Sequence, residues 1–209
     1  RGLVSGGADA FLIETSQDTR NIKAALLGCE HAFARVGRRI PIAISGTIEP
    51  MGTMLAGQSV EALATSVEHV DLLYLGLNCA TGPEFMTDHI RSLAQLTAFP
   101  VGCVPNAGLP DENGRYLETP AMISRSLRRF AEEGWLNVVG GCCGTTPEHV
   151  RAIVEAVRGL PPRKAHPRSA SRLSGVDYLE VGDDVRPVIV GERTNVIGSR
   201  KFKDLIVAE

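Results

Sequence analysis

The chain has 209 residues, a length that suits one large domain or two small ones. Its hydrophobic content of 44%, charged content of 22% and net charge of -2 are those of an ordinary globular protein, and they give no indication of a nucleic-acid or membrane-surface role. No apolar run reaches the length of a membrane span, and residues 1–10 lack the apolar core of a signal peptide.

Short apolar runs alternate with amphipathic runs along the first three quarters of the chain. In chain order they predict a strand over 10–15, a helix over 19–36, a strand over 41–45, a helix over 59–69, a strand over 71–78, a helix over 82–96, a strand over 99–106, a helix over 120–133, a strand over 136–141 and a helix over 147–157. The strands are apolar on both faces, which is typical of a parallel sheet covered by helices. The alternation predicts an α/β fold, either a barrel or a doubly wound sheet.

The composition changes after Gly159. Residues 159–187 contain four prolines and many serine, arginine and aspartate residues, and they predict an interdomain linker over 159–186 that lies against its neighbours. A buried-strand pattern resumes over 188–195, and the residues up to Glu209 read as the start of a helix. We therefore expect a first domain over 1–158 and the opening of a second over 187–209. A chain that begins at Arg1 without Met also reads as a piece of a longer polypeptide.

The five cysteines are Cys29, Cys79, Cys103, Cys142 and Cys143. An odd number in a chain of this size favours reduced thiols in an intracellular protein over a disulfide framework, so we expect a cytoplasmic location. Cys29 falls within an expected helix and Cys103 within an expected strand, and we interpret both as structural residues.

The other three cysteines follow expected strands. Cys79 comes directly after 71–78, whereas Cys142 and Cys143 come directly after 136–141. Parallel α/β folds place their active sites at the carboxyl ends of strands. Three thiolates that converge there would hold Zn²⁺ with its fourth position open, as catalytic zinc sites do. The alternative is that each is a small core residue, because 63 positions separate Cys79 from Cys142 and no CxxC pattern joins them.

Glycines bracket the cysteine pair. Adjacent residues in a regular strand point to opposite faces, so Cys142 and Cys143 reach one point only if the backbone leaves strand geometry. Gly140, Gly141 and Gly144 are expected to supply that freedom, through positive φ or close backbone approach.

Several segments carry a family resemblance. "LGLNCATGPE", "VPNAGLP" and "NVVGGCCGTTPEHVRAI" closely resemble the homocysteine-binding domain of the cobalamin-dependent methionine synthases. "SRLSG" and "VGERTNVIGSRKFK" resemble the linker and the first strand of the folate-binding (pterin) domain of that family. The resemblance implies a partial (β/α)8 barrel holding about strands 4–8, a linker, and the first strand of a second (β/α)8 barrel. With five β/α units instead of eight, the chain is expected to expose unpaired strand edges.

The resemblance also implies a chemistry. Members of the family bind Zn²⁺ through three cysteines that fall on Cys79, Cys142 and Cys143, and the homocysteine thiol enters as the fourth partner. Its thiolate attacks the methyl group of methylcobalamin, which a domain outside this chain carries, and methionine results. Methyltetrahydrofolate regenerates the donor on the second barrel. The folate and cobalamin modules of the same polypeptide are thus expected partners, and the chain alone is expected to be inactive.

Four further residues are implicated by the resemblance. Asn106 matches an asparagine that occupies the open zinc position until homocysteine displaces it, although it also suits a turn before Ala-Gly. Glu14 could hold the substrate ammonium group, or be a solvated carboxylate. Glu192 and Asn195 resemble folate-site residues at the end of the first pterin-barrel strand, where the site would be incomplete.

Two other functions compete with this interpretation. A cobalamin-independent homocysteine S-methyltransferase, which uses betaine or S-methylmethionine, shares the barrel and the three cysteines. Such an enzyme does not continue into a GERTN segment, so residues 188–203 argue against it. A non-catalytic module for zinc storage or thiol sensing would bind the same metal, but homocysteine would not change the metal's surroundings.

Overall fold

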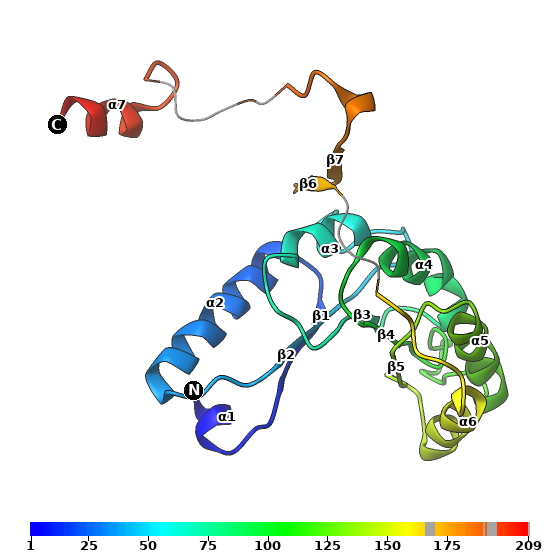
Figure 1. Cartoon of the computed structure of the whole chain (residues 1–209). Helices are drawn as coiled ribbons and strands as arrows, with labels where there is room; N and C mark the ends of the chain where they lie inside the picture. Colours follow the sequence, from blue (N-terminus) through cyan, green and yellow to red (C-terminus); the bar gives the residue numbers. More distant parts are fainter. Residues whose placement is uncertain (166–169, 190, 192–195, 209) are drawn as a thin grey trace.

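The computed structural model describes residues 1–165, 170–189, 191 and 196–208. Figure 1 shows a curved sheet whose strands alternate with helices. The alternating elements are β1 (Phe11–Ser16), α2 (Thr19–Val36), β2 (Ile42–Gly46), α3 (Val60–Val67), β3 (Leu75–Asn78), α4 (Thr87–Leu96), β4 (Val101–Val104), α5 (Pro120–Glu132), β5 (Val138–Val139) and α6 (Pro147–Val157). A short helix α1 (Gly2–Ser5) precedes them, and a 3-10 turn η1 (Pro83–Met86) leads into α4. The five β/α units predicted from the sequence are confirmed.

The main sheet of the described chain is parallel throughout, in the order β1-β2-β3-β4-β5. It does not close, so β1 and β5 each pair with one strand only. Helices α2 to α6 form an arc over one face of the sheet (Figure 1). The α/β class with a parallel sheet is therefore confirmed, whereas the eight-stranded closure stays a prediction.

The strand register separates a helix-covered face from an open one. Phe11 lies opposite Ile42 and stacks on Phe33 of α2, and Ile13, opposite Ile44, packs against the buried core. The intervening Leu12 is 49% exposed, and the burial of β1 alternates accordingly. The expectation that every strand is covered on both faces is therefore wrong for this edge strand, although every residue of β2 and β3 is buried.

Side-chain caps start the helices. Asp18 accepts a hydrogen bond from Arg20 N at the start of α2, Ser59 accepts from Ala62 N at α3, and the Thr119 side chain accepts from Met122 N at α5. These oxygens satisfy N–H groups that have no partner inside the helix. The helix starts therefore follow from local sequence, and α2 and α6 have the predicted limits.

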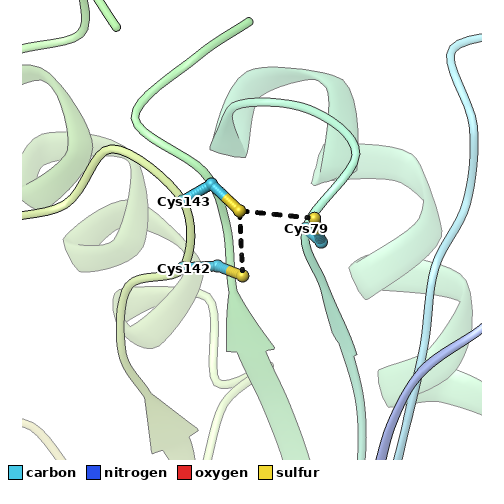
Figure 2. A group of neighbouring side chains, drawn as sticks. All are labelled: Cys79, Cys142 and Cys143. Atoms are coloured by element: carbon cyan, nitrogen blue, oxygen red, sulfur yellow. Dashed lines mark hydrogen bonds between the residues drawn. The ribbon is translucent and has the colours of Figure 1, made fainter.

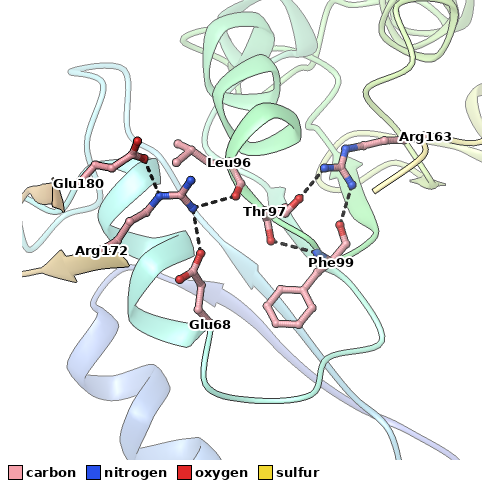
Figure 3. A network of polar contacts seen from close by, with 7 residues as sticks. All are labelled: Glu68, Leu96, Thr97, Phe99, Arg163, Arg172 and Glu180. Atoms are coloured by element: carbon pink, nitrogen blue, oxygen red, sulfur yellow. Dashed lines mark hydrogen bonds and ion pairs between the residues drawn. The ribbon is translucent and has the colours of Figure 1, made fainter. Parts of the chain in front are cut away.

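The segment after α6 runs back against the domain and buries Arg163, which is 5% exposed. Its guanidinium donates to the carbonyls of Ala94 (3.0 Å from Nε), Phe99 (2.9 Å from Nη1) and Thr97 (2.5 Å from Nη2), as Figure 3 shows in part. Its own carbonyl accepts from Asn137 Nδ2 at 2.9 Å. This part of the expected linker is therefore packed into the domain.

A hairpin of β6 (Ser171–Ser174) and β7 (Tyr178–Val181) follows and lies against α3. Ser174 Oγ donates to the Ala62 carbonyl at 2.8 Å. Arg172 forms ion pairs with Glu68 at 3.1 Å and Glu180 at 2.9 Å, shown in Figure 3. The linker expected over 159–186 thus contains antiparallel structure that the sequence analysis did not predict.

The last described elements are a 3-10 turn η2 (Asp183–Val185) and α7 (Arg200–Val207). Val188 and Ile189 lie outside regular secondary structure. Most of the strand expected over 188–195, including Glu192 and Asn195, lies outside the described residues, so that strand stays a prediction. Within the described ranges, no helix combines the length and apolarity needed to cross a membrane.

Candidate metal centre

Three sulfur atoms meet at the carboxyl edge of the sheet. Cys79 follows β3, whereas Cys142 and Cys143 lie in the loop after β5 (Figure 2). Cys143 Sγ is 3.8 Å from Cys79 Sγ and 3.9 Å from Cys142 Sγ, and all three sulfurs lie within 4.8 Å of one another. The structure therefore brings together the three cysteines that the sequence analysis singled out.

The backbone leaves strand geometry at the first of these cysteines. Cys79 has φ +64° and Ala80 has φ +57°, a region that residues with a side chain seldom occupy. The Cys79 carbonyl accepts from Thr81 N at 2.7 Å, which closes a tight turn. Strained backbone of this kind persists only where surrounding contacts hold it, and it is concentrated at functional sites.

The three glycines around the cysteine pair, Gly140, Gly141 and Gly144, do not all supply the backbone freedom that was expected of them. Positive φ occurs at Gly144 (φ +76°) but not at Gly140 or Gly141. A Cβ on Gly141 would lie 2.6 Å from a Thr145 methyl carbon, so close approach requires that glycine. A Cβ on Gly140 would meet Val104 at an ordinary 3.5 Å, so the predicted need for glycine there is wrong.

Gly144 offers a test of the loop. A Cβ at this position would lie 2.1 Å from Cγ of the Tyr116 ring, whereas a Cβ on Gly134, with φ +72°, meets nothing within 4 Å. Alanine at either position carries the backbone strain, but only Gly144→Ala also displaces the ring. We expect Gly134→Ala to lower the free energy of unfolding by about 1 kcal/mol, and Gly144→Ala to lower it by clearly more. Thermal unfolding measures both, and equal losses would contradict the close packing.

Backbone hydrogen bonds join the cysteine pair to the loop after β4. Cys142 N donates to the Pro105 carbonyl at 2.8 Å, and Ala107 N donates to the Cys143 carbonyl at 2.9 Å. Asn106, which is 4% exposed, accepts from Cys143 N at its Oδ1, at 3.0 Å. Asn106 thus braces the loop beside the sulfurs, and its role as a displaceable ligand stays a prediction.

Two residues near the sulfurs were missed by sequence reasoning. One is Asn78, the last residue of β3, whose Nδ2 lies 3.9 Å from Cys142 Sγ. It reads in the sequence as the end of a buried strand. In the sequence, only its position directly before Cys79 could have indicated that Asn78 lies near the sulfurs.

The other missed residue is Tyr116, whose ring packs on Gly144. Desolvation and the adjacent sulfur of Cys143 raise the pKa of Tyr116. His149 secures the loop that carries this tyrosine. Its Nδ1 accepts from Thr146 N at 3.1 Å, so its Nε2–H donates to the Glu118 carbonyl at 2.9 Å.

The surroundings of Cys142 oppose its ionisation in the absence of a cation. Burial raises the pKa of Cys142 to about 11, against the opposing hydrogen bond from Asn78, and the neighbouring Cys79 raises it further. A metal ion inverts this balance because its charge stabilises the thiolates that hold it. The three converging sulfurs therefore suit a soft divalent cation.

The remaining cysteines lie elsewhere. Cys103 is fully buried on β4, where its sulfur is 3.8 Å from Met86 Sδ, and Cys29 is half-buried on α2. Burial raises the pKa of both thiols. These positions agree with the structural role assigned to them.

Glu14 lies in an irregular part of β1 on the open face of the sheet. The pairing of β1 with β2 shifts between Ile13 and Ser16, and Glu14 is exposed there. Burial and the negative charge of Glu14 together raise the pKa of Tyr74. Contact of Glu14 with a substrate ammonium group stays a prediction.

The sequence profile of the family described as homocysteine S-methyltransferase matches residues 1–157. The chain belongs to the homocysteine S-methyltransferase family. The match ends at the last residue of α6, so it covers all five β/α units and all three clustered cysteines. Residues 1–157 are therefore a methyltransferase domain.

One relative and two solved structures extend the comparison. The methionine synthase of Mycobacterium tuberculosis (strain ATCC 25618 / H37Rv) is 40% identical over 215 positions, which cover 100% of this chain but 18% of that protein. The metallated homocysteine methyltransferase MmuM from Escherichia coli superimposes with a TM-score of 0.54 at 23% identity, over 72% of this chain and 46% of that one. Its apo form gives 0.55 at 23% identity, over 74% and 52%. The structural likeness shows a shared fold.

Proposed function

We propose that this domain holds Zn²⁺ through Cys79, Cys142 and Cys143 and activates the thiol of homocysteine for methylation to methionine. The observation that carries the proposal is the convergence of the three sulfurs, within 4.8 Å of one another, at the carboxyl edge of a parallel sheet. Family membership supports homocysteine as the substrate. Three protein ligands leave a tetrahedral ion one position for a substrate atom.

The donor set fits this ion. Thiolates are the soft ligands that zinc accepts, and the exposed Cys143 marks the side from which a small thiol can approach. When bound, zinc stabilises the thiolate form of homocysteine, which is the nucleophilic form. A Cys₃ set without a fourth protein sulfur is therefore suited to substrate binding as well as to metal storage.

The protein side chains around the sulfurs would bind and orient the substrate. We assign Glu14 to the ammonium group, because it is an exposed carboxylate at the carboxyl end of β1. We assign Asn106 to the open metal position of the resting site, because its Oδ1 is one hydrogen bond away from the Cys143 backbone. Incoming homocysteine would displace it, because zinc favours four ligands.

The methyl donor in this proposal is methylcobalamin, with methyltetrahydrofolate as its source. The support is the M. tuberculosis methionine synthase, whose 40% identity spans the whole chain and so continues past the family match into residues 158–209. The chain spans about a fifth of that relative's length, so the cobalamin and folate modules would belong to other parts of the polypeptide. Glu192 and Asn195 are proposed for the folate site.

X-ray absorption at the zinc edge tests the proposal. The resting site is expected to contain three sulfurs and one oxygen or nitrogen, and saturation with homocysteine should give four sulfurs. A proton should be released on binding near neutral pH, because the bound form is the thiolate. Homoserine, which carries a hydroxyl in place of the thiol, is the matched control and should leave the sulfur count unchanged. An unchanged count with homocysteine would exclude direct thiol activation and would favour a storage module.

A further inference from the structure

The buried side chain of Asn78 connects the ends of two strands to the cysteine loop. Asn78 is 2% exposed. Its Oδ1 accepts from Thr15 N at 3.0 Å, and its Nδ2 donates to Thr15 Oγ1 at 2.8 Å. The same Nδ2 lies 3.9 Å from Cys142 Sγ. One amide therefore reaches both the end of β1 and a sulfur of the candidate metal centre.

The orientation of this amide is fixed by its partners. A backbone N–H can only donate, so the Asn78 atom that faces Thr15 N must be the oxygen. The nitrogen then points towards Cys142 with a hydrogen to spare, because its other hydrogen is used by Thr15 Oγ1. Thr47 Oγ1 donates to the Asn78 carbonyl at 3.1 Å and holds the backbone of Asn78 in place.

The partner on β1 is itself strained. Thr15 has φ +52°, which is rare for a β-branched residue, and it lies where the pairing of β1 with β2 shifts. Such irregularities turn the affected backbone groups away from the neighbouring strand. Here the N–H of Thr15 donates to the side chain of Asn78, and Glu14 is the residue before Thr15. Asn78 therefore links the backbone that carries Glu14 to the sulfur of Cys142.

We propose that Asn78 is a positioning residue that holds the Cys142 sulfur in its metal-binding place by donating a hydrogen bond to it. The proposal rests on the proposed function only in taking the three cysteines as metal ligands. A thiolate is a charged acceptor, and hydrogen bonds to charged groups are stronger than neutral ones. Groups around a metal site that orient its ligands typically change metal affinity by about 10- to 100-fold when they are removed.

Cobalt substitution in the complete natural polypeptide tests this role, because Co²⁺ bound to thiolates has a sulfur-to-metal charge-transfer band, whereas Zn²⁺ has no band in the visible range. In Asn78→Ala the Cys142 thiolate loses its donor and becomes more electron-rich. The band should move to longer wavelength, and competition with a chelator should show metal binding weakened by at least about 10-fold. If Asn78→Ala does not fold, Asn78→Ser, whose side chain is shorter than the amide, provides the same comparison.

A second substitution, at Thr15, distinguishes a hydrogen bond from Asn78 to Cys142 from a role of Asn78 in supporting the strained end of β1. Glycine tolerates positive φ, so Thr15→Gly removes the strain. It also removes the Thr15 hydroxyl, but it keeps the backbone N–H that fixes the oxygen of Asn78 and therefore the direction of its nitrogen towards Cys142. We expect Thr15→Gly alone to leave the band in place, and the shift to persist in Asn78→Ala/Thr15→Gly. An unshifted band in Asn78→Ala, or its return in the double variant, would overturn the proposal. These measurements need no homocysteine, so they remain decisive if homocysteine fails to enter the metal shell and the proposed function is refuted.

Discussion

Replacing Cys79, Cys142 or Cys143 by alanine, one at a time, is expected to remove zinc from the domain. Each sulfur lies within 4.8 Å of the other two, so each variant leaves two thiols and an open side that water fills. We expect metal binding to weaken by more than about 100-fold, since loss of outer partners alone weakens it by about 10- to 100-fold. Metal analysis after dialysis measures zinc per chain, and homocysteine methylation by the complete polypeptide should fall with it.

Cys29→Ala is the matched control for these variants. Cys29 is half-buried on α2, away from the cluster, so its loss removes a small amount of packing and no ligand. Zinc content and homocysteine binding should therefore stay at the parent level. Full zinc retention in Cys79→Ala would remove that residue from the ligand set, and zinc loss in Cys29→Ala with an intact fold would show that the wrong cysteines were chosen.

The alternation of strands and helices was predictable because its signals are local. Apolar periodicity and helix caps lie within single segments, so α2 and α6 have the predicted limits. β3, β4 and β5 are shorter than predicted, since the length of a strand ladder depends on the neighbouring strand, whereas β1 and β2 keep the predicted length and are displaced by one residue. β5 contains two residues, Val138 and Val139, because its one pairing partner in the described chain is β4.

The site was predictable only in part. Three cysteines at strand ends meet because parallel strands bring their carboxyl ends to one edge, so position along the chain was sufficient. Asn78 and Tyr116 act through contacts with residues 28 or more positions away, Cys142 and Gly144, which no local pattern contains. The positive φ of Cys79 was equally invisible, since glycine was the expected residue for such backbone.

The structure of the segment predicted as a linker, 159–186, could not be predicted from composition either. Its prolines and polar residues predicted irregular chain, yet Arg172 is 8% exposed at its side chain and pairs with Glu68 and Glu180. Figure 3 shows this arginine and Arg163 on either side of the end of α4. Arginines in a polar segment are normally solvated, so composition alone could not indicate that these two are buried.

Arg163 is buried without a carboxylate partner among the described residues. It donates instead to backbone carbonyls, two of which, on Ala94 and Thr97, lie at the carboxyl end of α4. Carbonyls there have no partner within the helix and carry its partial negative charge. Burial lowers the pKa of Arg163, because desolvation disfavours the charged guanidinium, and the hydrogen bonds to the carbonyls oppose that cost.

Arg163→Met should therefore destabilise the domain strongly. The methionine fills much of the same space but leaves the carbonyls of Ala94, Thr97 and Phe99 without their donor, and each buried unpaired group costs roughly 1–3 kcal/mol. We expect the free energy of unfolding to fall by about 3 kcal/mol, with faster hydrogen exchange at the end of α4 and the start of β4. Arg158→Met is the matched control, because that arginine is 67% exposed in its pair with Glu155, and its replacement should change stability by less than about 0.5 kcal/mol. Similar losses of unfolding free energy in the two variants would contradict this role of Arg163. They would mean that water can replace its guanidinium as the hydrogen-bond donor to the carbonyls at the end of α4, and that the segment after α6 does not stabilise the domain.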